Sequence, residues 1–105
     1  LTGRAPDQTE AMALYEEGEK LFTQAQEAAP DKRRGLFDAA AGKYAAAAKK
    51  WPDSALEENA LMMVGESRYF ADRYPKAETA YELLIKKYPK TNEAKIAKDK
   101  LKDLK

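Results

Sequence analysis

The residues of this chain best suited to acid–base chemistry are two pairs of adjacent glutamates, Glu16-Glu17 and Glu57-Glu58. Two carboxylates catalyse hydrolysis when both side chains face the same substrate. Both pairs lie in segments with a helical pattern, and adjacent residues of a helix point about 100° apart. We therefore interpret both pairs as surface charges and predict no catalytic residue.

Other catalytic arrangements are limited by composition, because the 105 residues include no histidine and no cysteine. This excludes the Ser-His-Asp triad, a cysteine nucleophile, disulfide bonds and the usual zinc sites. Nothing in the sequence resembles a phosphate-binding loop. The sequence therefore predicts a protein that is not an enzyme and has no metal, no cofactor and no small-molecule substrate.

The charge balance narrows the possible partners. Nineteen basic and eighteen acidic residues give a formal net charge of +1, which argues against a dedicated nucleic-acid binder. No apolar run approaches the roughly 20 residues of a membrane span, so membrane attachment would need an anchor outside this sequence. The chain begins at Leu1, which is typical of a processed or engineered fragment, and the sequence predicts nothing about targeting.

The elements that position these side chains are all predicted to be helices. Apolar residues recur at three- and four-residue steps, and no segment alternates as a strand would. Asp7 with Glu10, and Ser54 with Glu57, have the spacing of a capping box at a helix start. Residues 1–6 are expected to be a flexible lead-in and residues 7–105 a single domain.

A repeat organises these predicted helices. Residues 58–91 have the pattern of two helices joined by a short turn, and three residues of the second helix have counterparts 37 positions earlier. The pairs are Ala40 and Ala77, Tyr44 and Tyr81, and Pro52 and Pro89. A repeated helical hairpin is the signature of a helical repeat protein, which works by presenting a surface.

The segment Glu58–Thr91 resembles a tetratricopeptide repeat (TPR), a helix-turn-helix unit of 34 residues. The residues that fit its pattern are Leu61, Gly65, Ala77, Tyr81, Leu84 and Pro89. Small residues let two helices approach, the aromatic ring fills the gap between them, and proline ends the second helix. An earlier copy keeps Gly18, Ala40, Tyr44, Ala47 and Pro52.

The earlier copy is longer, because Gly18 and Ala40 are 22 residues apart where Gly65 and Ala77 are 12 apart. We interpret the extra residues as longer helices, with a disordered loop as the alternative. The resemblance thus predicts an all-α, TPR-like α-solenoid of two antiparallel helical hairpins, residues 7–53 and 54–91, followed by a C-terminal capping helix, residues 92–105. The apolar positions of that helix are sparse, as suits a terminal helix.

The resemblance also implies a partner-binding groove, since the first helix of each TPR lines the concave face. The corresponding residues are Met12, Tyr15, Glu19, Phe22, Asn59, Met62, Glu66 and Tyr69. The alternative is that they pack against neighbouring helices, which we favour for Phe22 and for the adjacent Met63 and Phe70. Because Glu19 and Glu66 are acidic, we expect a basic or amphipathic peptide as the partner.

The ends of the two predicted hairpins resemble those of a more specific group of repeat proteins. Residues 49–54 and 86–91 both contain two lysines, an aromatic residue, proline, a variable residue and a hydroxyl residue. This ending is similar to repeats of bacterial envelope proteins, namely outer-membrane assembly lipoproteins of the BamD type and periplasmic coordinators of the YbgF type. The similarity implies a non-catalytic protein–protein interaction scaffold that is periplasmic or associated with the outer membrane. A cytoplasmic location is the alternative.

The segment from Lys86 to Lys105 contains eight lysines, both end residues included. They suggest a second hypothesis, a self-association or peripheral membrane-surface module. We favour a solvated capping helix instead, because we expect the lysines to be spread around it and no aromatic residue follows Tyr88. The sequence indicates no particular partner protein and no oligomeric state.

Overall fold

The structure is a computed structural model that describes residues 7–104. Five helices follow one another along the chain: α1 (Gln8–Glu27), α2 (Pro30–Lys50), α3 (Ala55–Phe70), α4 (Tyr74–Lys87) and α5 (Asn92–Leu104). The described part of the chain contains no strand, so the predicted all-α helical repeat fold is confirmed. The expected lead-in, residues 1–6, lies outside the described residues.

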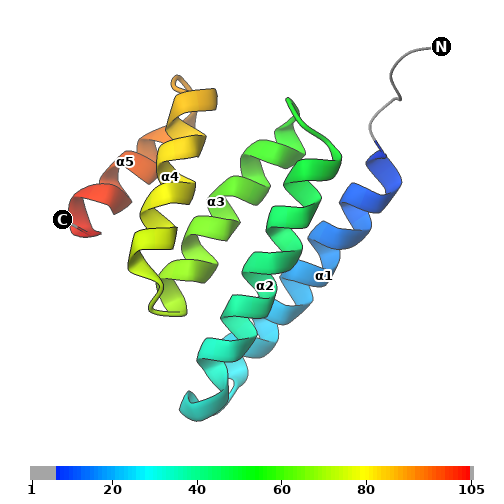
Figure 1. Ribbon diagram of the computed structural model, residues 1–105, viewed down its shortest axis with the longest axis vertical. Coiled ribbons are helices and arrows are strands. Elements are labelled where there is room, and N and C mark those ends of the chain that lie inside the picture. Colours follow the sequence, from blue (N-terminus) through cyan, green and yellow to red (C-terminus); the bar gives the residue numbers. More distant parts are fainter. Residues whose placement is uncertain (1–6, 105) are drawn as a thin grey trace.

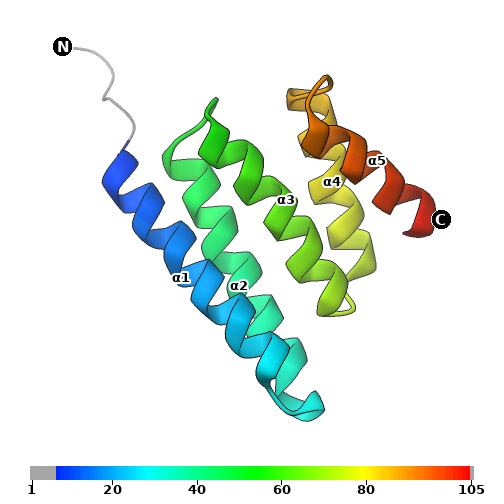
Figure 2. The same ribbon diagram turned by 180° about the vertical axis from the view of Figure 1, so that it is seen from behind.

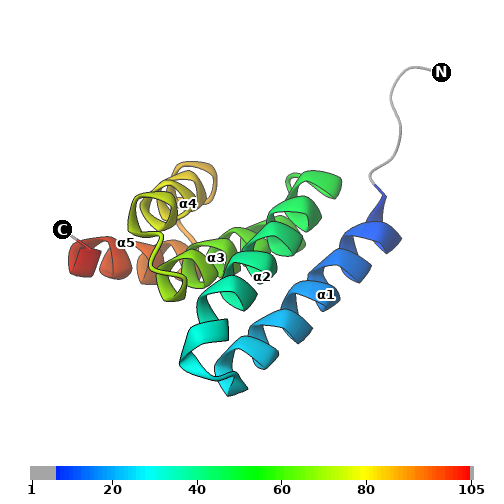
Figure 3. The ribbon, with the colours of Figure 1, turned by 60° about the horizontal axis from the view of Figure 1, so that its bottom comes forward.

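The helices form two layers (Figure 1). We call the surface formed by α1, α3 and α5 the inner face, and Figure 2 shows it from the front with α2 and α4 behind. The opposite surface, formed by α2 and α4, is the outer face. No Cα atom of α2 lies within 8 Å of one in α4, so these two helices are held apart by α3 (Figure 3).

Side-chain caps begin all three helices of the inner face. Asp7, Ser54 and Thr91 accept hydrogen bonds from the backbone N–H groups three residues later, at 2.9, 3.0 and 3.1 Å. Each bond satisfies a backbone donor that has no partner within its helix. The helices of the outer layer instead carry proline in their first turn, Pro30 in α2 and Pro75 in α4. Proline is favourable there because its ring already has the helical φ angle.

Alanine and tyrosine build the centre of each hairpin. Ala40 and Tyr44 in α2, and Ala77 and Tyr81 in α4, are all completely buried. Each tyrosine ring packs against the glycine of the preceding helix, Gly18 for Tyr44 and Gly65 for Tyr81. Pro52 and Pro89 lie just beyond the ends of α2 and α4. The repeat positions thus join the two helices of each hairpin.

The first hairpin is taller than the second. Its helices have 20 and 21 residues, where α3 and α4 have 16 and 14. Only Ala28 and Ala29 separate α1 from α2, so the extra residues are helical. An aromatic cluster packs beside the tall end, where the ring centroid of Phe37 lies 5.2 Å from those of both Phe22 and Phe70.

Helix α5 covers the far side of α3 and α4. It buries Ala94 and Ala97 completely and leaves Leu101 and Leu104 half-buried. Lys102 lies eleven residues after the cap residue Thr91, where the other two inner helices have Gly18 and Gly65. A helix packed on α5 as α4 packs on α3 would meet this lysine. Helix α5 therefore lacks the contact surface of a third regular hairpin.

Candidate interaction surface

The side chains predicted to bind a partner differ in exposure. Met12, Glu19 and Asn59 are exposed, with Met12 at 47%. Tyr15, Phe22, Glu66 and Tyr69 are half-buried, while Met62 is only 8% exposed. The inner face therefore offers a partner the exposed residues together with the edges of the half-buried aromatic rings.

A hollow of about 330 Å³ lies at one end of the inner face, between α1 and α3. It brings together three of the predicted residues, Met12, Tyr15 and Asn59, with Trp51 and Leu56. The sequence interpretation did not place Trp51 and Leu56 in a binding surface. Trp51 follows the last residue of α2 and is half-buried there, which leaves part of a large aromatic side chain available to a partner.

A second hollow, of about 300 Å³, lies at the other end of the inner face. Tyr69 lines it together with Tyr74 of α4 and Asp103 and Leu104 of α5. The ring centroids of Tyr69 and Tyr74 are 5.5 Å apart. Sequence spacing from the two hairpins did not indicate Tyr74 or Asp103, because each comes from another helix.

Acidic residues lie at equivalent positions of the three inner helices. Glu19, Glu66 and Asp103 each come twelve residues after a cap residue, Asp7, Ser54 and Thr91 respectively. Burial, followed by the charges of Glu19 and Glu66, raises the pKa of the Tyr15 phenol. The equivalent positions of the three carboxylates make the centre of the inner face acidic.

Some predicted binding residues also stabilise the fold. The Tyr15 ring packs edge-on against Tyr44 with 5.1 Å between centroids, and Phe22 packs in the same way against Phe37 at 5.2 Å. Met62 belongs to the core cluster that contains Tyr81. Substitutions of Tyr15, Phe22 or Met62 would therefore change the stability of the fold as well as any binding.

Comparison with known protein families identifies the second hairpin. Residues 59–91 match the family model described as Tetratricopeptide repeat. This chain contains a TPR. Repeats of this family generally mediate protein–protein interactions, and proteins built from them are generally non-catalytic scaffolds that bind other proteins or peptides. Searches of curated proteins and of solved structures gave no match.

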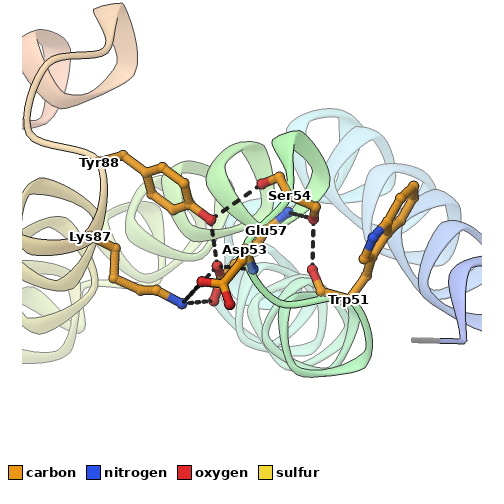
Figure 4. A network of polar contacts seen from close by, with 6 residues as sticks. All are labelled: Trp51, Asp53, Ser54, Glu57, Lys87 and Tyr88. Atoms are coloured by element: carbon orange, nitrogen blue, oxygen red, sulfur yellow. Dashed lines mark hydrogen bonds and ion pairs between the residues drawn. The ribbon is translucent and has the colours of Figure 1, made fainter. Parts of the chain in front are cut away.

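A polar network joins the end of the second hairpin to its beginning (Figure 4). Glu57 lies between Lys87, whose Nζ is 2.8 Å from Oε2, and Tyr88, whose hydroxyl donates to Oε1 at 2.5 Å. The backbone N–H of Asp53 donates to Oε1 at 2.9 Å. Glu57 is only 7% exposed, so its interpretation as a surface charge was wrong. Its role is to connect α3 with the end of α4.

The network shifts the pKa values of its members. Burial alone would raise the pKa of Glu57, but the hydrogen bonds from Lys87, Tyr88 and Asp53 outweigh it and lower the pKa below the ordinary 4.5. Burial and the same carboxylate raise the pKa of Tyr88 to about 12. A weaker counterpart exists in the first hairpin, where Lys50 Nζ lies 3.4 Å from Glu10 Oε2.

The other glutamates of the two pairs have different surroundings. Glu16 and Glu17 are exposed, as predicted, and Glu17 pairs with Lys43 at 3.4 Å. Glu58 is half-buried, and one of its carboxyl oxygens has no hydrogen-bond partner. Burial and the neighbouring Glu93 carboxylate raise the pKa of Glu58. Glu16 and Glu17 are therefore surface charges, whereas Glu58 lies beside a second carboxylate.

Three of the lysines of α5 lie near one another. Lys95, Lys98 and Lys102 are exposed and follow the spacing of residues on one face of a helix, which we call the lysine face. Asp99 is exposed on the same face, and Lys100 is half-buried away from it. Within residues 7–104 no helix is long and apolar enough to cross a membrane. The same residues contain no group of three or more acidic side chains placed to hold a metal ion.

Proposed function

We propose that this TPR-containing domain is a non-catalytic interaction module whose inner face binds a basic or amphipathic segment of a partner protein. The observation that carries the proposal is the acidic line of Glu19, Glu66 and Asp103 on the inner face, which has a partly apolar hollow at each end and Asp103 in the lining of the second hollow. A cationic side chain of the partner would meet the carboxylates. Apolar side chains on either side of it would enter the hollows at Met12 and at Tyr69.

The same charges argue against other ligands. Phosphate groups of a nucleic acid or of a lipid would be repelled by an acidic face, because like charges disfavour association. An acidic peptide would be disfavoured for the same reason. The inner face thus selects by charge among the protein segments that TPR domains generally bind.

Selection from a displayed peptide library tests this proposal, followed by fluorescence anisotropy with the selected peptides. We expect peptides rich in lysine or arginine with aromatic or aliphatic neighbours. The charge reversals Glu19→Lys and Glu66→Lys should each weaken binding about tenfold, the scale of one charge-assisted contact. Glu82→Lys, on an exposed position of α4 in the outer layer, is the control and should leave affinity unchanged. Acidic selected peptides, or equal losses in all three variants, would contradict the proposal.

We also propose a setting in the bacterial cell envelope, at the outer membrane or in the periplasm. The support is the shared hairpin ending of residues 49–54 and 86–91, in which Tyr88 and Lys87 hold Glu57. The sequence upstream of Leu1 in the gene tests it. A signal peptide or a lipid-attachment motif supports an envelope location, and a cytoplasmic neighbouring domain would overturn it.

The lysine face of α5 favours a second candidate function, which is attachment to an anionic surface. Lys95, Lys98 and Lys102 would contact lipid headgroups, and salt would weaken that contact. Co-sedimentation with phosphatidylglycerol vesicles at low and high salt tests this. The triple change of these lysines to glutamine should abolish co-sedimentation; if it leaves co-sedimentation unchanged, this candidate fails.

A further inference from the structure

The outer face contains an apolar groove that the proposed function does not use. Its volume is about 380 Å³, and it runs between α2 and α4 above α3. Leu61 and Val64 form its floor, and alanines and one leucine line its sides. These residues are Ala45, Ala48, Ala80 and Leu83. Leu83 is 43% exposed, which is high for a leucine with apolar neighbours.

Unpaired positive charges line this groove. Lys49 and Arg68 belong to its lining, and Arg68 also lines an adjoining hollow of about 250 Å³ that Lys76 borders. Among residues 7–104, no carboxylate oxygen lies within 4 Å of the charged nitrogens of these three residues. The groove therefore combines an apolar floor with cations that form no direct ion pair among the described residues.

The carboxylates that border the groove are already engaged. Glu57 is held by Lys87 at 2.8 Å, and Asp38 pairs with Arg73 at 3.2 Å. Arg68 is half-buried and donates a hydrogen bond from Nη1 to the backbone carbonyl of Lys76 at 3.2 Å. Burial lowers the pKa of its guanidinium, because removal from water disfavours the charged form, and the charge of Asp38 offsets this only in part. A carboxylate from a partner would restore the lost stabilisation.

We propose that the outer groove binds an acidic amphipathic helix of a partner protein. The apolar side of that helix would lie on Leu61, Val64 and Leu83, and its acidic residues would pair with Arg68 and Lys49. Amphipathic helices bind grooves of this type through apolar residues spaced by three or four positions. The alanines at the sides of the groove permit a close approach of the incoming backbone, because their side chains are short.

This inference is independent of the inner-face proposal, since the groove lies on the outer layer and is lined by Lys49 and Arg68, while Glu19, Glu66 and Asp103 lie on the inner layer. Together they describe a scaffold that holds a basic segment on one face and an acidic helix on the other. A domain with two such surfaces can bring two partners together without any catalytic residue.

The experiment uses two synthetic helical peptides and ¹⁵N-labelled protein. Both peptides have leucines at positions i, i+3 and i+7; one carries glutamates on its flanks, and its twin carries lysines there. We expect the acidic peptide to shift amide signals of Ala45, Ala48 and Leu83, and the basic twin to leave those signals in place. Arg68→Gln should lower the affinity for the acidic peptide about tenfold. Lys98→Gln, an exposed lysine of α5, is the control.

Leu83→Gln is a second variant. Because Leu83 is exposed, the substitution should leave the fold intact. It should also weaken binding of the acidic peptide about tenfold. Shifts that map to the inner face, equal affinity for both peptides, or no binding of either would overturn the inference. Binding of phosphatidylglycerol vesicles that Arg68→Gln abolishes, without peptide binding, would assign the groove to a membrane surface. Concentration-dependent dimers that Leu83→Gln dissolves would assign it to a second copy of the chain.

Discussion

The ring of Tyr81 occupies the space where a side chain at Gly65 would begin. A Cβ atom at Gly65 would lie 2.7 Å from Cδ1 of Tyr81, closer than such atoms approach in proteins. The same relationship joins Gly18 to Tyr44, where the distance would be 2.9 Å. Because both tyrosine side chains are completely buried, neither ring is free to move away. Each hairpin therefore depends on a glycine in its first helix.

Gly65→Ala should destabilise the domain although alanine is the better helix former. The helix gains about 1 kcal/mol from the substitution, but overpacking against Tyr81 costs about 1–3 kcal/mol and should exceed it. Gly65→Leu should lower the free energy of unfolding further, because leucine is larger than alanine. Gly42→Ala is the control, because nothing lies within 4 Å of a Cβ atom there, and it should stabilise by up to about 1 kcal/mol. Urea unfolding measures all three; equal stabilisation by both alanine variants would refute the Gly65–Tyr81 contact.

Phe37→Ala tests the taller end of the first hairpin. Phe37 is 3% exposed and packs against Phe22 and Phe70, so its truncation should cost about 3–5 kcal/mol of unfolding free energy. Phe70→Ala should cost much less, because Phe70 is 46% exposed. Thermal melts of the two variants provide the measurement. Similar melting temperatures would mean that the cluster does not stabilise the extended helices.

Glu57→Gln should weaken the connection between α3 and the end of α4. Glutamine keeps the shape but loses the charge that Lys87 and Tyr88 contact, and the loss should be about 1.5–3 kcal/mol near neutral pH. Since folding lowers the pKa of Glu57, its contribution is present above pH 4.5 and is lost as the pH falls through the folded-state value. Urea unfolding at several pH values should show the difference from the native chain shrinking in acid. Glu16→Gln, an exposed control, should show little change.

Glu58→Gln should have the opposite effect. Because folding raises the pKa of Glu58, the group favours the folded state below pH 4.5 and loses that contribution as the pH rises through the folded-state value. An uncharged glutamine removes the cost of the buried charge beside Glu93. We expect a higher melting temperature than the native chain near neutral pH and no advantage in acid. A lower melting temperature at neutral pH would show that the Glu58 charge is stabilising.

The helices and the packing centre of each hairpin followed from local sequence. Asp7 and Ser54 begin helices because a side-chain oxygen satisfies a free N–H nearby, and Pro52 and Pro89 follow helix ends because proline cannot continue a helix. The spacing of Gly65, Ala77 and Tyr81 indicated the hairpin, since close approach needs small residues opposite an aromatic ring. These signals act over a few turns, so they can be read from the chain.

Burial and the shape of the surfaces depended on which helices meet. Glu57 looked like a surface charge because its partners, Lys87 and Tyr88, come thirty residues later. Tyr74 and Asp103 join Tyr69 only because the start of α4 and the end of α5 lie beside the end of α3. The outer groove exists because α3 holds α2 and α4 apart, a distance that no local pattern encodes. Local sequence therefore determined the repeat, while tertiary packing decided which charges are buried and which surfaces a partner can reach.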